Sequence, residues 1–247
     1  MTDPWRVGAN LATLANGLLG VAAILYTLAG NPIWAMLLIA IAIGFDGLDG
    51  LLSRRSRLPA RRFGRVVDSV ADAVTYGIAP AVLIADHTGA AWAPFGDLAV
   101  GLAAAYAAAA IARLVYFTAR GYERPYFLGV PTPQAALAVI VALLFHSDPA
   151  FQSVQPIGVL VGGAAISVLM VAPIPYPKIR AGATLRWPMA STGVAAAFAL
   201  VPLQFRPAAG SPLYDIAYAS ALAMLVGVAS YYVLGPFTVL RGVADGP

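Results

Sequence analysis

Long apolar runs, separated by short polar segments, recur along the whole chain. Runs of roughly 17–25 residues are long enough to cross a bilayer core of about 30 Å as helices. We therefore expect an all-α fold, a polytopic membrane helical bundle that forms one integral membrane domain over residues 1–247. The pattern predicts eight transmembrane helices, at about 9–29, 33–53, 65–86, 96–118, 132–146, 156–173, 187–203 and 214–236.

The composition supports a membrane protein and excludes some other classes. Only 11% of the residues are charged and 60% are hydrophobic, whereas about a quarter of a soluble domain is charged. The chain has no cysteine, which excludes disulfides and thiolate ligands. The net charge of +4 comes from basic residues at the ends of the predicted helices. This placement is typical of a lipid headgroup surface and does not indicate a nucleic-acid partner.

The basic residues also predict how the bundle is oriented. If the N-terminus is cytoplasmic, every one of the 15 Lys and Arg residues except Arg206 falls on the cytoplasmic side. By the positive-inside rule, both termini are then cytoplasmic and the number of spans is even. We expect an integral protein of the cytoplasmic membrane whose active site faces the cytoplasm.

Four aspartates interrupt the second and third apolar runs. Asp46 and Asp49 are three residues apart, and Asp68 and Asp72 are four apart, so each pair lies on one face of its helix. In antiparallel neighbouring helices both pairs would reach a similar depth, and ionisable groups there indicate a functional site. Four carboxylates repel one another unless a cation is present, and magnesium prefers carboxylate and phosphate oxygens. Two such ions could serve a phosphoryl transfer.

Other interpretations of this region remain open. The acids could instead form a structural ion network with Arg54 and Arg65. Gly47, Gly50 and Gly64 flank the acids and would let a ligand approach closely, although any one of them could serve helix packing alone. Three polar residues of the first run share one helix face and could contact a ligand or bond to neighbouring helices: Asn10, Thr13 and Asn16.

The acids and their surroundings resemble the CDP-alcohol phosphotransferase family. The family pattern is D-x-x-D-G-x-x-A-R, a short loop, and then G-x-x-x-D-x-x-x-D. The chain matches it with Asp46, Asp49, Gly50, Arg54, Gly64, Asp68 and Asp72. It departs from it at Ser53, where the family has alanine, and in the loop from Arg54 to Gly64, which has nine residues, one more than expected.

Further segments resemble the phosphatidylserine synthase subgroup of this family. They are "ANLATLANGLLG" in the first run, "FLGVPTPQAA" (127–136) and "LMVAPIPYPKIR" (169–180). The resemblance therefore covers about residues 9–180, the expected catalytic core, while the last two spans, about 187–236, agree in topology only. One segment departs: "ARLVYFT" (112–118) lacks the second arginine and the asparagine of the subgroup's "ARLARFN".

The resemblance implies an enzyme of phospholipid synthesis. It would transfer a phosphatidyl group from CDP-diacylglycerol to L-serine, releasing CMP and making phosphatidylserine. It implies a cofactor of divalent metal, Mg²⁺ or Mn²⁺, as two ions. The partners would be CDP-diacylglycerol or CDP-archaeol, L-serine, membrane lipids and a second copy of the chain in a homodimer.

The resemblance also implies roles for individual residues. The metal ligands would be Asp46, Asp49, Asp68 and Asp72, with Asp72 as ligand or general base. The CDP-lipid donor would contact Asn10, Thr13, Gly50, Ser53, Arg54 and Gly64. The serine carboxylate would bind Arg113, with Lys178 and Arg180 as weaker candidates.

Two alternatives to this function stay open. The acceptor could be another alcohol, such as inositol phosphate, glycerol phosphate or choline, since the departure at 112–118 touches the expected acceptor site. The acids could instead serve a cation-coupled transporter. Transporters usually place such groups near the membrane midplane between repeat halves, and this sequence shows no repeat.

Overall fold

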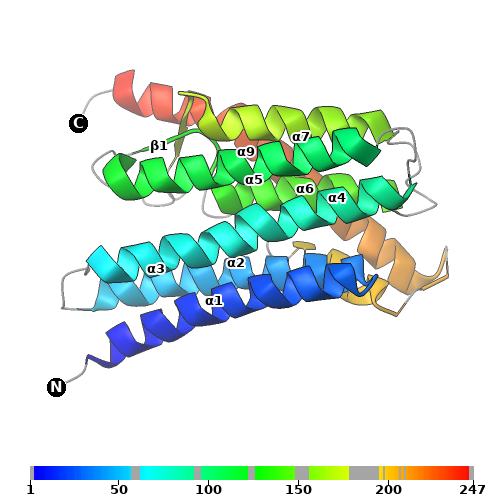
Figure 1. Ribbon diagram of the computed structural model, residues 1–247, viewed down its shortest axis with the longest axis horizontal. Helices are drawn as coiled ribbons and strands as arrows, with labels where there is room; N and C mark the ends of the chain where they lie inside the picture. Colours follow the sequence, from blue (N-terminus) through cyan, green and yellow to red (C-terminus); the bar gives the residue numbers. More distant parts are fainter. Residues whose placement is uncertain are drawn as a thin grey trace.

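The computed structural model is almost entirely helical, and the helices lie side by side along one long axis (Figure 1). The residues that it describes are 3–56, 62–91, 96–121, 126–147, 156–177, 195–196, 198–205, 207–208 and 210–244. In chain order the elements are α1 (Pro4–Leu28), α2 (Pro32–Arg55), α3 (Arg62–Asp72), the π-helical stretch η1 (Ala73–Ile78), α4 (Ala79–Ala91), α5 (Gly96–Tyr116), a second π-helical stretch η2 (Phe117–Gly121), β1 (Tyr126–Leu128), α6 (Thr132–Ser147), α7 (Pro156–Val171), β2 (Pro175–Pro177) and α9 (Pro212–Ala244).

The predicted membrane helices are largely confirmed. Over the described residues, five helical segments are long and apolar enough to cross a membrane: Pro4–Leu28, Pro32–Arg55, Gly64–Asp86, Gly96–Ala119 and Pro212–Arg241. The fifth and sixth predicted spans correspond to the shorter helices α6 and α7. The seventh, 187–203, lies largely outside the described residues, although 198–203 are helical. An all-α membrane bundle is therefore confirmed, and the total of eight spans stays a prediction.

The first helix begins and the last helix ends at the same end of the bundle. The start of α1 and the end of α9 both lie at the left of Figure 1. This arrangement agrees with an even number of crossings. The side of the membrane that this end faces stays a prediction.

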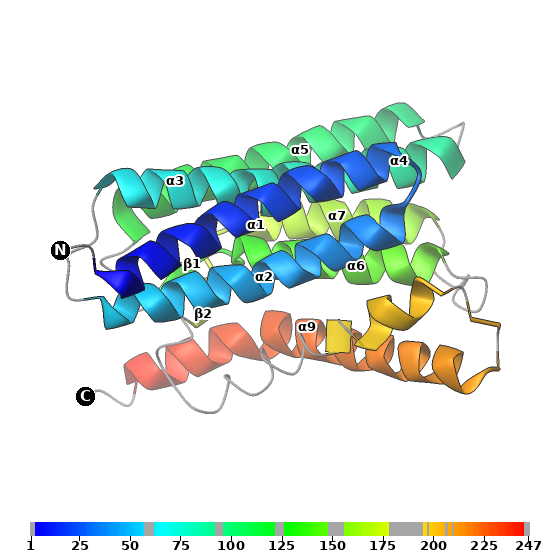
Figure 2. The same ribbon diagram turned by 90° about the horizontal axis from the view of Figure 1, so that it is seen from below.

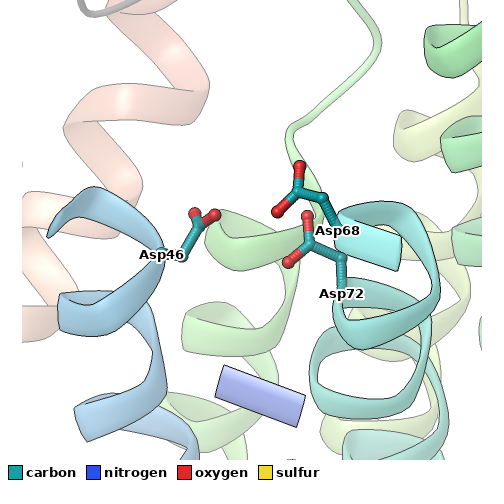
Figure 3. A group of neighbouring side chains, drawn as sticks. All are labelled: Asp46, Asp68 and Asp72. Atoms are coloured by element: carbon teal, nitrogen blue, oxygen red, sulfur yellow. The ribbon is translucent and has the colours of Figure 1, made fainter. Parts of the chain in front are cut away.

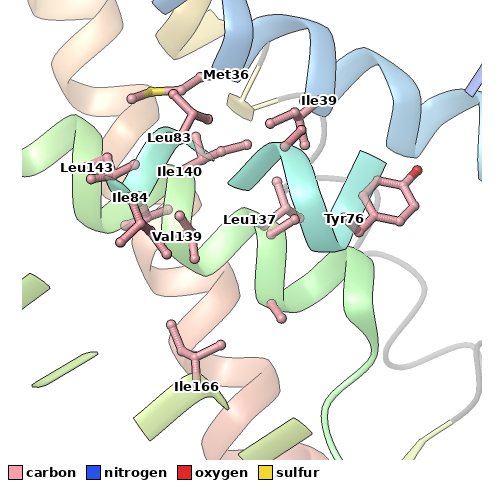
Figure 4. Close-up of a cluster of buried hydrophobic side chains, with 14 of the residues drawn as sticks. Met36, Ile39, Tyr76, Leu83, Ile84, Leu137, Val139, Ile140, Leu143 and Ile166 are labelled. Carbon is pink, nitrogen blue, oxygen red and sulfur yellow. The ribbon is translucent and has the colours of Figure 1, made fainter. Parts of the chain in front are cut away.

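The helix α6 forms the centre of the bundle. Its side chains are buried almost all round, including Leu137, Ile140 and Leu143 (Figure 4). They pack against Met36 of α2 and Leu83 of α4, among others. A helix that is apolar on every face is stable only when other helices surround it, which explains why a short helix occupies this position.

A small antiparallel sheet, which the sequence patterns did not predict, closes the same end of the bundle. β1 pairs with β2 in the register Phe127 to Tyr176. Beyond the sheet, the Gly129 N–H donates to the Ile174 carbonyl at 2.8 Å. The two strands belong to the segments 127–136 and 169–180, each of which resembles the phosphatidylserine synthase subgroup in sequence. Their pairing explains why both are present: each supplies the other's backbone hydrogen bonds.

Replacing Gly129 by alanine should destabilise this pairing strongly. Gly129 has φ +74°, and an added Cβ would lie 2.0 Å from the Met170 carbonyl oxygen. The control is Gly30→Ala, because Gly30 has nearly the same φ, +73°, but open space around it. Backbone strain alone costs about 1–3 kcal/mol, so Gly129→Ala should lower the melting temperature in detergent well beyond the control. Equal melting temperatures would contradict the close approach.

Candidate active site

The four aspartates form one cluster, hereafter the acid cluster (Asp46, Asp49, Asp68 and Asp72). Asp46 projects from α2 towards Asp68 and Asp72 on α3 (Figure 3). One carboxylate oxygen from each of these three lies within 4.8 Å of the others. Asp49 lies within hydrogen-bonding range of Asp68. The two pairs, which the sequence predicted at a similar depth, therefore come together in one cluster.

The helix α1 holds two of these acids by hydrogen bonds. The Thr13 hydroxyl donates to Oδ2 of Asp49. The Asn16 side-chain amide donates to Oδ1 of Asp72 at 2.9 Å. Both donors are buried. The polar face of α1 thus orients carboxylates that would otherwise be costly to bury.

A close helix crossing makes the second contact possible. An added Cβ on Gly20 would lie 2.7 Å from the Thr75 Cα, so only glycine fits between α1 and η1. At this crossing the Thr75 hydroxyl donates to the backbone carbonyl oxygen of Asn16 at 2.9 Å. The crossing therefore fixes Asn16 opposite Asp72, one turn before Thr75.

The carboxylates fit a hard divalent cation. Three oxygens from three side chains converge, and Mg²⁺ and Mn²⁺ are bound by such oxygens, usually together with substrate phosphates. The acids belong to helices, which hold ligands more rigidly than loops do. The identity of the metal and the number of ions stay predictions.

The structural-network interpretation named two arginines, Arg54 and Arg65. Arg54 is exposed. A guanidinium nitrogen of Arg54 lies 3.4 Å from the position that a Cβ added to Gly50 would take. Arg6 lies near Asp49, and Arg113 lies near Asp72. The structural-network interpretation with Arg54 and Arg65 stays a prediction.

Arg113 lies deep in the bundle beside the acid cluster. Its side chain is only 7% exposed. The guanidinium carbon lies 5.4 Å from the centre of the Phe127 ring of β1, a cation–π contact. Its Nε has no hydrogen-bond partner. A buried cation with an unsatisfied donor is costly unless an anion binds it, so Arg113 has the properties of an anion-binding residue.

The remaining predicted residues lie in different surroundings. Ser53 is half-buried, and its hydroxyl donates to the Gly50 carbonyl at 3.2 Å. Gly64 is half-buried beside Arg6. Asn10 is exposed, and no hydrogen bond joins it to the acid cluster. Lys178 and Arg180 lie outside the described residues. The donor and acceptor roles of these residues stay predictions.

Sequence reasoning missed Tyr76. This side chain is fully buried in the π-helical stretch η1, and the negative charges of Asp46, Asp68 and Asp72 act on its hydroxyl. That hydroxyl has no hydrogen-bond partner. π-Helical turns occur frequently at functional sites. The available signal was the position of Tyr76 four residues after Asp72, about one helical turn along the same helix.

A second missed contact involves the segment that departs from the subgroup pattern. Thr118, in place of asparagine, lies in η2 and shares a hydrogen bond of 2.5 Å with Ser69 of α3. Ser69 follows Asp68 directly. The departure therefore keeps a polar contact between the end of the fourth span and the acid-bearing helix.

Comparisons with known proteins show what the whole chain is similar to. The sequence model of the CDP-alcohol phosphatidyltransferase family matches residues 6–171. The chain is 29% identical over 181 residues to a CDP-diacylglycerol–serine O-phosphatidyltransferase of Helicobacter pylori, covering 72% of this chain and 75% of that protein. It is 32% identical over 192 residues to the enzyme of that name from Mycobacterium bovis, covering 71% and 65%. An archaetidylserine synthase of Methanothermobacter thermautotrophicus is 30% identical over 173 residues, covering 69% of each chain.

Proposed function

This chain belongs to the CDP-alcohol phosphatidyltransferase family, and we propose that it transfers a phosphatidyl group from a CDP-linked lipid to L-serine. The observation that carries the proposal is the acid cluster beside the buried Arg113. The carboxylates suit phosphoryl transfer and the arginine suits a carboxylated acceptor. The names of the similar proteins support serine as the acceptor and either diacylglycerol or archaeol as the lipid of the donor. Nothing in the comparisons supports the transporter alternative.

In the proposed reaction the serine hydroxyl oxygen forms a bond to the lipid-side phosphorus of the donor. The bond from that phosphorus to the bridging oxygen of the pyrophosphate breaks, and CMP leaves with the bonding electrons. The hydroxyl proton goes to Asp72. The products are phosphatidylserine, or its archaeol counterpart, and CMP. Catalysis in such transfers is chiefly positioning and charge stabilisation.

Each residue of the site has a proposed part in this reaction. Asp46, Asp49 and Asp68, with Asp72, would hold divalent metal at the donor pyrophosphate. When bound, Mg²⁺ or Mn²⁺ would supply positive charge to the phosphate oxygens. Thr13 and Asn16 orient Asp49 and Asp72.

The hydrogen bond from the Asn16 side chain occupies only one of the two carboxylate oxygens of Asp72. Asn16 donates to Oδ1 of Asp72, so Oδ2 stays available to accept the serine proton. Gly50, Ser53, Arg54 and Gly64 are proposed to line the cytidine and pyrophosphate, with Asn10 as an outer contact. Arg113 is proposed to bind the serine carboxylate, with Lys178 and Arg180 as weaker candidates.

The site is further proposed to open to the cytoplasm. The distribution of Lys and Arg supports this orientation. At that interface a lipid donor can enter sideways from the leaflet while serine enters from water. We also propose that the chain acts as a homodimer in the cytoplasmic membrane.

The deciding experiment is a panel of alcohols with CDP-diacylglycerol and purified protein. CMP release and the mass of the lipid product are measured with L-serine, inositol phosphate, glycerol phosphate and choline. We expect serine-dependent CMP release and phosphatidylserine as the product. Release with another alcohol but not with serine would replace the acceptor, and the absence of CMP release with all four would remove the proposed activity.

Replacing Arg113 by lysine should weaken serine binding. Lysine keeps the positive charge but loses the planar fork that binds a carboxylate with two hydrogen bonds. We expect a serine KM raised by about tenfold or more, the worth of one hydrogen bond to a charged group, while the KM for the CDP-lipid changes little. The control is Arg54→Lys, because Arg54 is exposed and assigned to the donor. An unchanged serine KM in the Arg113 variant would remove Arg113 from the acceptor site.

A further inference from the structure

The last helix reaches the active-site end of the bundle from outside the matched family segment. That segment ends at residue 171, whereas α9 begins at Pro212. α9 packs against β2 and α6, and Figure 2 shows it alongside both. Gly235 permits the close approach, because an added Cβ would lie 3.2 Å from both Tyr176 and Pro177. The end of α9 is therefore held firmly against the small sheet.

Three tyrosines meet at this contact. The ring of Tyr231 stacks on that of Tyr176, with 5.5 Å between centroids and 20° between planes. Tyr232 meets both rings edge-on, at 6.4 Å from each. Tyr231 is 3% exposed. These rings form a packed aromatic wall. It lies beside Arg113, because the Arg113 guanidinium carbon is 5.4 Å from the Phe127 ring and Phe127 pairs with Tyr176 in the small sheet.

The two α9 hydroxyls are weakly engaged within the protein. Tyr231 donates to the Pro177 carbonyl at 3.4 Å and Tyr232 to the Gln134 carbonyl at 3.5 Å. Good O–H···O bonds are 2.5–3.0 Å long. Both hydroxyls can therefore turn to a stronger acceptor at small cost. The neighbouring Arg113 Nε is buried and has no partner at all.

We propose that α9 completes the acceptor subsite, with the hydroxyls of Tyr231 and Tyr232 donating hydrogen bonds to the same anionic group that Arg113 binds. The ligand class is a small alcohol that carries a carboxylate or a phosphate. One guanidinium and two phenol donors around one anion satisfy the unpaired Nε and replace two long hydrogen bonds by charge-assisted ones. The inference rests on the proposed function for the identity of the alcohol.

The position of this subsite relative to Asp72 suits a short acceptor. Two contacts join the segment that carries Asp72 to the segment that carries Arg113: Gly77 with Ala110, and Ser69 with Thr118. Asp72 and Arg113 both lie between these contacts, so the proposed base and the anion-binding group are neighbours. In serine the carboxylate and the hydroxyl are on adjacent carbons, so an anchored carboxylate places the hydroxyl within a few ångströms of it. Such an arrangement brings the hydroxyl to the base with little freedom left to lose.

The test uses Tyr231→Phe, Tyr232→Phe and the double variant of the full chain. Phenylalanine keeps the ring contacts and removes only the hydroxyl. The control is Tyr26→Phe, since Tyr26 lies near the other end of the bundle in α1 and is exposed. The measurements are KM for L-serine, KM for CDP-diacylglycerol, kcat at saturating serine, and kcat/KM for ethanolamine, which is serine without its carboxylate.

We expect each α9 variant to raise the serine KM by about tenfold, with the donor KM and the ethanolamine kcat/KM little changed. In combination with Arg113→Lys the effects should be less than additive, because all three residues bind one group. A serine KM equal to that of the Tyr26→Phe control would overturn the subsite and leave the proposed function intact. If the wild-type protein uses a phosphorylated alcohol instead of serine, the proposed function fails, and the KM of that alcohol in the same variants decides the inference. A lowered melting temperature with unchanged KM would assign the hydroxyls a structural role and overturn it.

Discussion

Replacing Asp72 by asparagine is expected to lower kcat by about 10²–10⁴, the usual worth of positioned general acid–base catalysis. Asparagine has nearly the same shape but cannot accept the serine proton. The fold should survive, because the side-chain carbonyl of the new asparagine can still accept the hydrogen bond from Asn16, which is 2.9 Å long in the native protein. If Asp72 acts chiefly as the base, binding of CDP-lipid with metal should persist.

The matched variant is Asp46→Asn. Asp46 is on the opposite helix, and its oxygen converges with those of Asp68 and Asp72, but it is assigned no proton transfer. Its loss should weaken metal and donor binding as well as the rate. Donor and metal affinities are measured for both variants, followed by single-turnover rates at saturating metal. If Asp72→Asn loses metal affinity as severely as Asp46→Asn, Asp72 is chiefly a ligand and the proton goes elsewhere.

The acid cluster could be predicted from sequence because its determinants are local. Spacings of three and four residues put each pair on one helix face, and a short connection makes neighbouring helices antiparallel. Asp46 and Asp72 were therefore expected at a similar depth, and the structure places them on facing helices. Arg113 could be singled out as a single charged residue inside an apolar span that matches the family motif, but its burial is visible only in the structure.

The partners of these residues could not be predicted in this way, because they depend on how distant helices cross. The contact of Asn16 with Asp72 requires the close approach at Gly20, where Thr75 lies 2.7 Å from an added Cβ. A single glycine in an apolar run has many possible roles. Its role here became clear only from the packing of α1 against η1.

The small sheet and the α9 tyrosines left even less trace in the sequence. β1 and β2 have three residues each, and β2 contains two prolines, so no alternation of apolar and polar residues marks them. Tyr231 and Tyr232 lie in an apolar span beyond the recognisable motifs, where two adjacent tyrosines are also typical of an interfacial belt. Only the packing of α9 on β2, whose partner strand β1 holds Phe127 against Arg113, brings them to this part of the site.

Removal of divalent metal is expected to abolish CMP release altogether. Asp46, Asp68 and Asp72 cannot all be ionised within 4.8 Å of one another without a compensating cation, and the donor pyrophosphate would add further negative charge. Protein treated with a chelator should have no activity and regain it on addition of Mg²⁺ or Mn²⁺. Measured turnover without divalent metal would remove the metal assignment.

A titration with Mg²⁺ would show which carboxylates hold the metal. In Asp46→Asn the half-saturating Mg²⁺ concentration should rise by about tenfold or more, since removing even an indirect partner of a metal ligand costs 10–100-fold in affinity. The control is Asp97→Asn, because Asp97 is exposed in the first turn of α5. Asp49→Asn is the informative third variant: Asp49 is held by Thr13 and lies outside the converging group of three. A shift as large as that of Asp46→Asn would make Asp49 a direct ligand, whereas a smaller shift would assign it to orienting Asp68.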